Sequence, residues 1–404
     1  MNVTIAIFGL ALLVLVHEAG HFFAALAVGM SPRKFYIGFP PAIVKRKRNG
    51  VEYGIGAIPL GGYVRIPGMH RPAPQDVDVH FGPARHERPE LTVPLERLRR
   101  ALVDNDLIAA QHELEVLDHA VRRADLSPQA LRAAERGLRD IGDALAPDAY
   151  WRQAIWKRIV AIAAGPAANI VLALVLFTAL FVMTGGAATS QVKSVRSGYP
   201  AVAAGLHAGD RVLAIDNKPV SPGDIAKAIN DTKGKPVPVI VARGKELVEL
   251  GPIRAHKDSD GIYRFGFMLD RKNLTLAGAA WQSARLTGLV TKEIGLSLSR
   301  LVHGSGRKDI SSPVGIVQGS SAAIDQGTES HLWVLGLLSL SLALLNLLPL
   351  LPLDGGHILF SIIEGVRGRA VGRRVYERVS AVGLAVVLLL FFIGLSNDIG
   401  RLGS

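Results

Sequence analysis

Residues 14–23, VLVHEAGHFF, place two histidines and a glutamate inside a stretch that is otherwise suited to lipid. His17 and His21 are four positions apart, so on a helix they project from the same face and can bind one metal ion. Glu18 is offset around the helix, where its carboxylate can act as a base on water. Zinc suits this set, because it activates water and polarises a carbonyl for hydrolysis. Ionisable groups inside a membrane span cost roughly 2.5 kcal/mol or more each, which indicates that these have a function.

A catalytic zinc takes three protein ligands and keeps one position open, so the histidine pair needs a third partner. The chain has no cysteine, which leaves nitrogen and oxygen ligands. The segment 345–360, LNLLPLLPLDGGHILF, offers Asp354 just after Pro349 and Pro352, which break a hydrophobic helix. Asp354 is the preferred ligand and His357 a weaker competitor. Taken alone, Asp354 is equally well explained as a helix-end or interface carboxylate.

The composition indicates a membrane protein, since 49% of the 404 residues are hydrophobic and only 20% are charged. Four segments have about the twenty apolar residues that a transmembrane helix needs. They are Val3–Leu26, Ile159–Met183, Leu332–Leu353 and the shorter Val379–Leu395. The first resembles a signal peptide, but no Lys or Arg precedes it, so it is expected to remain as a span.

Positive charge is concentrated in the loops that flank the spans. The net charge is +12, and clusters of Lys and Arg lie within 31–50, just before the second span, and within 367–378. The positive-inside rule makes these loops cytoplasmic and both termini extracytoplasmic. The basicity is therefore explained by topology and by anionic lipid, and no nucleic-acid partner is expected.

Residues 51–66, VEYGIGAIPLGGYVRI, predict a β-hairpin. Apolar residues alternate through 51–57, Pro59 and Gly61–Gly62 form the turn, and YVRI returns. A glycine-rich edge strand can pair with the extended backbone of a substrate, although the same pattern also fits a small structural ribbon. In the second span, AAGPAANIVLA allows close helix approach, and Asn169 is either a link between helices or a group that lines a cavity.

The two longest soluble segments differ in character. Residues 187–272 contain GLHAGDRVLAIDNKPV, which matches the PDZ pattern of a Gly-Asp turn before an alternating strand. A PDZ domain captures peptide ends by strand addition, and the alternative is a passive steric plug. Residues 70–90 look flexible, and three helices are expected to follow, with Ser127 as a cap. These are Leu95–Asp104, Leu107–Ala124 and Pro128–Leu145. Partner binding and spacing are equally suitable roles for this insertion.

Five motifs together resemble the site-2 protease family of intramembrane metalloproteases, peptidase family M50. They are HEAGH, EYGIGAIPLGGYVRI (52–66), AAGPAANIVLA (163–173), SSPVGI (311–316) and NLLPLLPLDGG (346–356). The similarity covers most of the chain and is closest to the bacterial kind that has a PDZ domain, such as the sigma-E-pathway protease. The chain has Ser312-Pro313 where Gly-Pro is usual in the family.

The resemblance implies that His17, His21 and Asp354 bind Zn2+ and that Glu18 is the catalytic acid/base. It also implies that Asn346 helps to hold the substrate. For substrate binding, Gly61 and Gly62 of the predicted hairpin are added as the edge that pairs with substrate.

The expected fold is a polytopic α-helical membrane protein with about four transmembrane helices. It includes a membrane-associated β-hairpin, a cytoplasmic helical insertion and one extracytoplasmic PDZ domain. The expected segments are 1–30 (transmembrane helix 1 with HExxH), 31–69 (cytoplasmic loop and hairpin), 70–150 (helical insertion), 151–186 (transmembrane helix 2), 187–272 (PDZ domain), 273–331 (extracytoplasmic interfacial segment), 332–358 (transmembrane helix 3 with LDG) and 359–404 (cytoplasmic loop and transmembrane helix 4).

The expected function is that of a zinc-dependent intramembrane endopeptidase in the bacterial inner membrane. Its partners would be the lipid bilayer, peptide ends at the PDZ domain and transmembrane protein substrates, with an anti-sigma factor or a signal-peptide remnant as candidates. The competing function is a non-catalytic, metal-binding membrane scaffold that recruits partners through its PDZ domain. Glu18 favours the enzyme, because a scaffold has no use for a base beside its metal.

Overall fold

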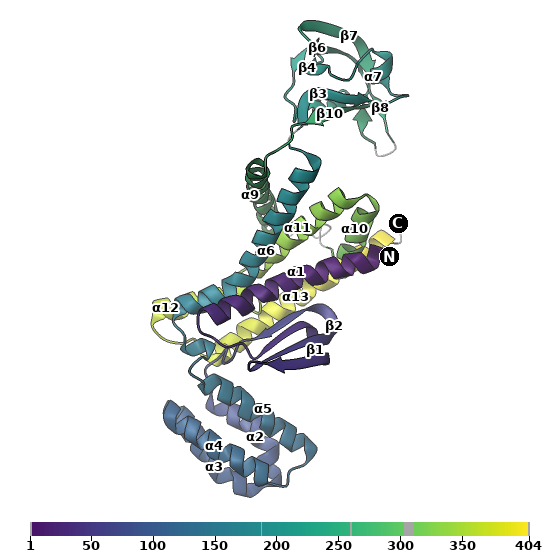
Figure 1. Ribbon diagram of the computed structural model, residues 1–404. Coiled ribbons are helices and arrows are strands. Elements are labelled where there is room, and N and C mark those ends of the chain that lie inside the picture. Colours follow the sequence, from purple (N-terminus) through teal and green to yellow (C-terminus); the bar gives the residue numbers. More distant parts are fainter. Residues whose placement is uncertain (1, 187, 259–260, 303–310, 403–404) are drawn as a thin grey trace. The chain divides into compact units, whose positions relative to one another are not determined.

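The computed structural model describes residues 2–186, 188–258, 261–302 and 311–402, and it contains two compact units (Figure 1). One unit comprises Met1–Ala173 with Leu289–Ser404, and the other comprises Leu174–Gly288. Residues 187 and 259–260 of the expected PDZ domain, and 303–310 of the expected interfacial segment, lie outside the described residues.

Within the described residues, four helices are long and apolar enough to cross a membrane, which agrees with the predicted polytopic membrane protein. They are α1 (Asn2–Ala27), α6 (Ile155–Thr184), α11 (Thr328–Asn346) and α13 (Arg373–Leu402). The expected third span is too long, because α11 ends at Asn346 and a turn separates it from α12 (Asp354–Arg367). Pro349 and Pro352 lie in this turn and lack the backbone N–H that a continuing helix would require.

The insertion between α1 and α6 is a four-helix cluster with its own apolar core. Its elements are α2 (Pro74–Glu87), the 3-10 turn η1 (Pro89–Leu91), α3 (Thr92–Val103), α4 (Leu107–Arg123), α5 (Pro128–Leu145) and the 3-10 turn η2 (Tyr150–Arg152). The last three helices were expected within a few residues of these bounds. As predicted, Ser127 caps α5, since its hydroxyl oxygen accepts from the Ala130 amide at 3.2 Å.

Helix α2 lies where a flexible stretch was expected, so that prediction is wrong. Val77, Phe81 and Ala84 are buried and follow helical spacing, which gives α2 an apolar stripe to pack against α5. Asp76 supports its first turn by accepting from the Ala73 backbone amide at 2.8 Å. The prolines of this stretch obscured the pattern, although Pro74 is at the start of the helix, where proline is tolerated.

Strands β1 (Lys34–Arg48) and β2 (Val51–Arg65) form a sheet whose register differs from the predicted hairpin. Residues 42–48 lie opposite 51–56 across an Asn49–Gly50 turn, in which both residues have positive φ. Lys34–Ile37 lies opposite two parts of β2 at once, 52–55 and 62–65. The predicted pairing of 51–57 with 63–66 is therefore wrong, because Asn-Gly is a stronger hairpin signal than the later Pro and Gly residues.

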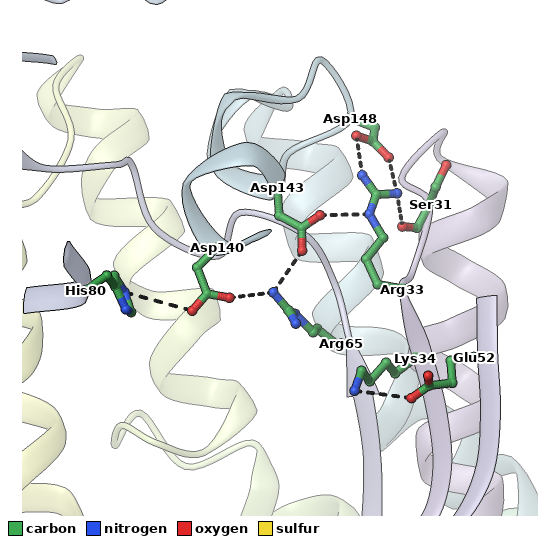
Figure 2. A network of polar contacts seen from close by, with 9 residues as sticks. All are labelled: Ser31, Arg33, Lys34, Glu52, Arg65, His80, Asp140, Asp143 and Asp148. Carbon is green, nitrogen blue, oxygen red and sulfur yellow. Dashed lines mark hydrogen bonds and ion pairs between the residues drawn. The ribbon is translucent and has the colours of Figure 1, made fainter. Parts of the chain in front are cut away.

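Two arginines connect this sheet to the helical insertion, as Figure 2 shows. Arg33 Nε lies 3.0 Å from Asp143 Oδ1, and its Nη1 lies 3.0 Å from Asp148 Oδ2. Arg65 Nη2 lies 2.6 Å from Asp140 Oδ1 and 2.9 Å from Asp143 Oδ2. Arg33 and Arg65 are neighbours at one end of this pairing, where the Arg33 amide donates to the Arg65 carbonyl at 2.7 Å. Asp143 thus bridges two adjacent arginines and anchors α5 to the strands.

The second unit is built around a sheet with the order β10-β3-β4-β6-β7, with β5 paired to β4. Its elements are β3 (Ala188–Val195), α7 (Pro200–Ala203), β4 (Arg211–Ile215), β5 (Lys218–Pro219), α8 (Ile225–Asp231), β6 (Pro236–Arg243), β7 (Glu246–Arg254), β8 (His256–Lys257), β9 (Tyr263–Arg264) and β10 (Phe267–Arg271), followed by α9 (Leu276–Val302), which extends beyond this unit. Arg243 hydrogen-bonds to the buried Asp210 and holds the pKa of that carboxyl below its usual value.

Near its C-terminal end, α13 carries a buried carboxylate that caps α10 (Pro313–Asp325). Asp398 Oδ2 accepts from the backbone amides of Ser312 at 2.7 Å and Gly315 at 3.1 Å. A Cβ added at Gly315 would lie 2.5 Å from the same carboxylate, so only glycine leaves room for it. Ser312 is the N-cap, and its hydroxyl accepts from the Val314 amide, which accounts for serine in place of the usual glycine.

We expect Asp398→Ala to destabilise the protein, because two amides would lose their acceptor at a cost of about 1–3 kcal/mol for each buried donor. Asp398→Asn keeps an acceptor oxygen and should lie between Asp398→Ala and the wild type. Thermal unfolding in detergent micelles measures the effect, with the exposed neighbour Ile399→Ala as the control. Equal melting temperatures for Asp398→Ala and Ile399→Ala would contradict a capping role.

Candidate metal centre

Three ligand atoms from opposite ends of the chain converge at one point. His17 and His21 come from successive turns of α1, and Asp354 is the first residue of α12. The two Nε2 atoms lie 3.2 Å apart, and Asp354 Oδ2 lies 3.2 Å from His17 Nε2 and 3.3 Å from His21 Nε2. Both histidines are buried and Asp354 is half-buried, so the cluster is largely removed from solvent.

Glycines at three positions leave the space in which the side chains of this cluster and the neighbouring backbone pack closely. A Cβ at Gly165 in α6 would lie 2.2 Å from His21 Nε2, and one at Gly20 would lie 2.4 Å from the Ala164 carbonyl oxygen. At the other end, a Cβ at Gly355 would lie 2.2 Å from the Leu347 carbonyl oxygen, so the turn after α11 folds tightly onto α12. The small residues thus give the close helix approach expected of α6, and Gly165 specifically makes room for a site residue.

Hydrogen bonds to Nδ1 orient the imidazole rings. His21 Nδ1–H donates to the Ala161 carbonyl at 3.0 Å, which leaves the Nε2 lone pair free. The Asn169 amide lies 3.4 Å from His17 Nδ1, and its Oδ1 is buried without a hydrogen-bond partner among the described residues. If the Asn169 amide is turned so that its Oδ1 accepts from His17 Nδ1–H, the buried Oδ1 gains a hydrogen-bond partner. The Nε2 atom of His17 then has a free lone pair, like that of His21.

The sequence alone did not assign Asn169 to the site. Its backbone carbonyl accepts from the Ser339 hydroxyl of α11 at 2.8 Å, so this residue also links two spans. Of the two roles left open for Asn169, the link between helices is observed through its backbone carbonyl, and its buried side chain faces His17. Lining a cavity stays a prediction. A signal was present, because Asn169 is the one strongly polar side chain in the apolar segment 163–173.

The geometry suits a tetrahedral cation. Ligands at zinc bond lengths are separated by about 3.3 Å along the edge of a tetrahedron, which agrees with the three observed separations. Asp354 Oδ2 has no hydrogen-bond partner among the described residues. Two imidazole lone pairs and one carboxylate oxygen would repel one another at this distance, and a cation between them removes the repulsion. The donor set of two nitrogens and one oxygen is one that zinc accepts.

Glu18 lies beside the cluster and outside it. A Cβ at Gly62 of β2 would lie 2.2 Å from Glu18 Cγ, so the glycine strand packs directly against the glutamate side chain. Gly62 is buried, and Gly61 precedes it in the same strand. Glu18 and the two predicted substrate-binding glycines are thus neighbours in space.

The other candidates occupy distinct positions. The Nδ1 of His357 contacts the Tyr376 hydroxyl, and His357 is absent from the group of metal-ligating atoms found within the described residues. Asn346 is half-buried and is the last residue of α11. The irregular segment 347–353 separates it from Asp354. The structure therefore brings His17, His21 and Asp354 together, with Glu18, Gly61 and Gly62 beside them.

Comparison with known proteins identifies the family. The sequence profile of peptidase family M50 matches residues 5–390. The chain belongs to peptidase family M50. It is 32% identical to the regulator of sigma-W protease RasP of Bacillus subtilis, over 98% of this chain and 97% of that protein. It is 31% identical to the zinc metalloprotease RasP of Bacillus licheniformis over the whole of both chains, and 28% identical to a probable protease, eep, of Enterococcus faecalis over 98% of each.

Membership of family M50 confirms the predicted enzyme class. The protein is an intramembrane zinc metalloprotease and a multi-pass membrane protein, and the scaffold alternative is set aside.

We expect Asn169→Leu to lower zinc affinity roughly 10- to 100-fold, because His17 would lose the partner that fixes its ring and tautomer. Asn169→Asp keeps the acceptor and should stay closer to the wild type. Competition with a chromogenic chelator measures the affinity, and the exposed Val171→Ala in the same helix is the control. Unchanged affinity in Asn169→Leu would show that Asn169 only links the helices.

Proposed function

We propose that His17, His21 and Asp354 hold the zinc and that Glu18 is the catalytic acid/base. The observation that carries this proposal is the convergence of three lone-pair atoms at separations of 3.2–3.3 Å, one of them a buried oxygen without a hydrogen-bond partner among the described residues. The fit is best for zinc, and the zinc metalloprotease names of the relatives agree with it.

The chemistry divides between the metal and Glu18. When bound, zinc supplies Lewis-acid polarisation of the scissile carbonyl and of the attacking water. Glu18 takes a proton from that water and gives it to the nitrogen of the leaving amine, so one carboxylate serves both halves of the hydrolysis. Packing against Gly62 limits the positions that the Glu18 side chain can adopt, and this holds the base in place.

The substrate is proposed to pair with the edge of β2. Within the described sheet, residues 62–65 pair with Lys34–Ile37 and have no strand on their other side. An extended peptide can add to this edge by main-chain hydrogen bonds, which would also unwind a helical substrate beside Glu18. Gly61 and Gly62 lack side chains that would obstruct it, and Asn346, at the end of α11, is assigned to hold the bound chain.

The expected domains and topology are part of the proposal, with the third span corrected to end at Asn346. The basic loops 31–50 and 367–378 face the cytoplasm of a bacterial cell, and the β1–β2 sheet is associated with the membrane. Both termini and residues 187–272 are extracytoplasmic. The metal site then lies in the cytoplasmic half of the membrane, since α1 exits there.

Residues 187–272 are proposed to be a PDZ domain that binds peptide ends. Strand β10 is at an edge of its sheet, and a cavity of about 770 Å3 is lined by residues of β10 and α8, including Phe267, Leu269, Ile225 and Ile229. An edge strand facing a helix across an apolar groove suits strand addition.

The substrates are proposed to be membrane-anchored regulators such as anti-sigma factors, by analogy with the Bacillus subtilis relative, whose name is regulator of sigma-W protease.

Glu18→Gln tests the catalytic assignment. It should bind zinc like the wild type, because the three ligands remain, and should lower cleavage of a transmembrane reporter by at least about 100-fold. Zinc content by mass spectrometry and cleavage in proteoliposomes give the two readouts. Cleavage within a few-fold of the wild type would refute Glu18 as the base.

Deleting residues 190–270, with a short linker across the gap, tests the PDZ domain as a size filter. We expect the deleted enzyme to cut a substrate whose extracytoplasmic domain is intact, whereas the wild type prefers a pre-truncated substrate. Ala226→Trp, which fills the groove from an exposed position, is the matched variant. It should weaken capture of trimmed ends and keep the exclusion of large ones. If the wild type, the deletion variant and Ala226→Trp all preferred the truncated substrate equally, the PDZ domain would not be the size filter.

A further inference from the structure

A second cavity lies within the unit formed by Met1–Ala173 and Leu289–Ser404, and its lining does not include His17, His21 or Asp354. It has a volume of about 530 Å3, in the range of small-ligand sites. Its walls come from the chain just before α2, from α3 and η2, from the start of α6, and from α12 and α13. Its polar and aromatic lining includes Arg71, Tyr150, Trp151, Arg158, His357 and Glu364.

Two helices place this cavity next to the proposed active site. His357 lines it and is three residues after Asp354 on α12, which is about one helical turn. Arg158 lines it from α6 and is three residues before Ala161, whose carbonyl accepts from His21. A group in the cavity is therefore about one helical turn from Asp354 along α12, and about one turn along α6 from the carbonyl that contacts His21.

Arg158 is a buried cation with unused hydrogen-bonding capacity. It is only 8% exposed, and its Nε has no hydrogen-bond partner among the described residues. Its Nη2 donates to Glu364 Oε2 at 2.6 Å, and its guanidinium lies over the Tyr150 ring, 4.9 Å from the centroid. A buried donor without an acceptor is costly, which points to a ligand that supplies an oxygen.

The charge of the lining favours an anion. Among the described residues that line the cavity, Glu364 is the one that is acidic. Both of its oxygens are engaged, one by Arg158 and the other by the Val371 amide at 2.9 Å. Arg71 adds a second cation, stacked on Trp151 at 5.5 Å. With neutral histidines the lining carries one excess positive charge, surrounded by aromatic and aliphatic side chains. An anionic group with an apolar chain attached fits this combination.

We propose that this cavity binds the free carboxylate end of the peptide product, with Arg158 as its principal contact. The inference rests on the proposed function. Hydrolysis adds one water across the peptide bond, breaks C–N, and yields a carboxylate on one fragment and an ammonium group on the other. The carboxylate therefore forms within reach of a partly unsatisfied guanidinium. A lipid phosphate shares the chemistry, but every turnover generates the peptide carboxylate beside the cavity.

Binding is measured with full-length Glu18→Gln protein, which does not consume ligand. The probes are an apolar decapeptide ending in a free carboxylate and the same peptide ending in an amide, titrated in neutral detergent micelles. We expect the acid to bind roughly 10-fold or more tightly, as a charge-assisted hydrogen bond would give. The wild-type enzyme should show the same ratio for product inhibition of reporter cleavage. Equal affinities for acid and amide would overturn the proposal.

Variants identify the contact. Arg158→Gln/Glu364→Gln removes both charges of the pair together, so neither is left buried and alone, and it should abolish the preference for the acid. The control Arg97→Gln, at an exposed position of α3 outside the cavity, should retain it. A preference that survives in the double variant would refute Arg158 as the contact. Arg71→Gln provides a second variant with little risk to folding, and it should reduce the preference.

The lipid source is tested in nanodiscs of phosphatidylcholine with and without phosphatidylglycerol. If phosphatidylglycerol abolishes acid binding through an Arg158-dependent competition, the site belongs to a lipid headgroup and the proposal fails. The proposed function fails separately, by reporter cleavage in Glu18→Gln.

Discussion

The meeting of His17, His21 and Asp354 is the constraint on which the membrane unit depends. The two histidine Nε2 atoms and the Asp354 carboxylate oxygen lie 3.2–3.3 Å apart, a spacing that suits three ligands of one cation. The surrounding features serve that approach: Gly165 makes room for His21, and the Gly355 turn closes tightly behind Asp354. The Ala161 carbonyl then fixes which nitrogen of His21 faces the centre. Close packing around these residues thus depends on glycines at the points of contact as well as on apolar burial.

Much of this arrangement could be predicted from the residues. The i, i+4 histidines define one face of a helix, and Asp354 was the strongest remaining oxygen ligand after a proline-broken span. Other features depend on tertiary contacts that no local pattern encodes. The sheet register followed Asn49–Gly50 and placed Lys34–Ile37 between two parts of β2. Helix α2 formed despite its prolines, because its apolar stripe had α5 to pack against.

The helical insertion is more than an appendage to the loop after α1. Arg33 and Arg65 lie together at one end of the sheet pairing that contains Gly62, and both are held by carboxylates of α5 and the residues just after it. Such partly buried multi-charge networks restrain geometry better than isolated surface pairs do. The insertion therefore stabilises the strand that packs on Glu18, and it also contributes a wall of the cavity around Arg158.

The distance in sequence between the ligands has a consequence for biosynthesis. The first 65 residues contain the histidine pair, Glu18 and the strand against which Glu18 packs, whereas the carboxylate comes from residue 354. A nascent chain emerging from the ribosome therefore carries His17, His21 and Glu18 long before Asp354 is synthesised. The apolar helices α1, α6 and α11 must be synthesised first. The three proposed ligands can therefore meet only after most of the chain has been translated.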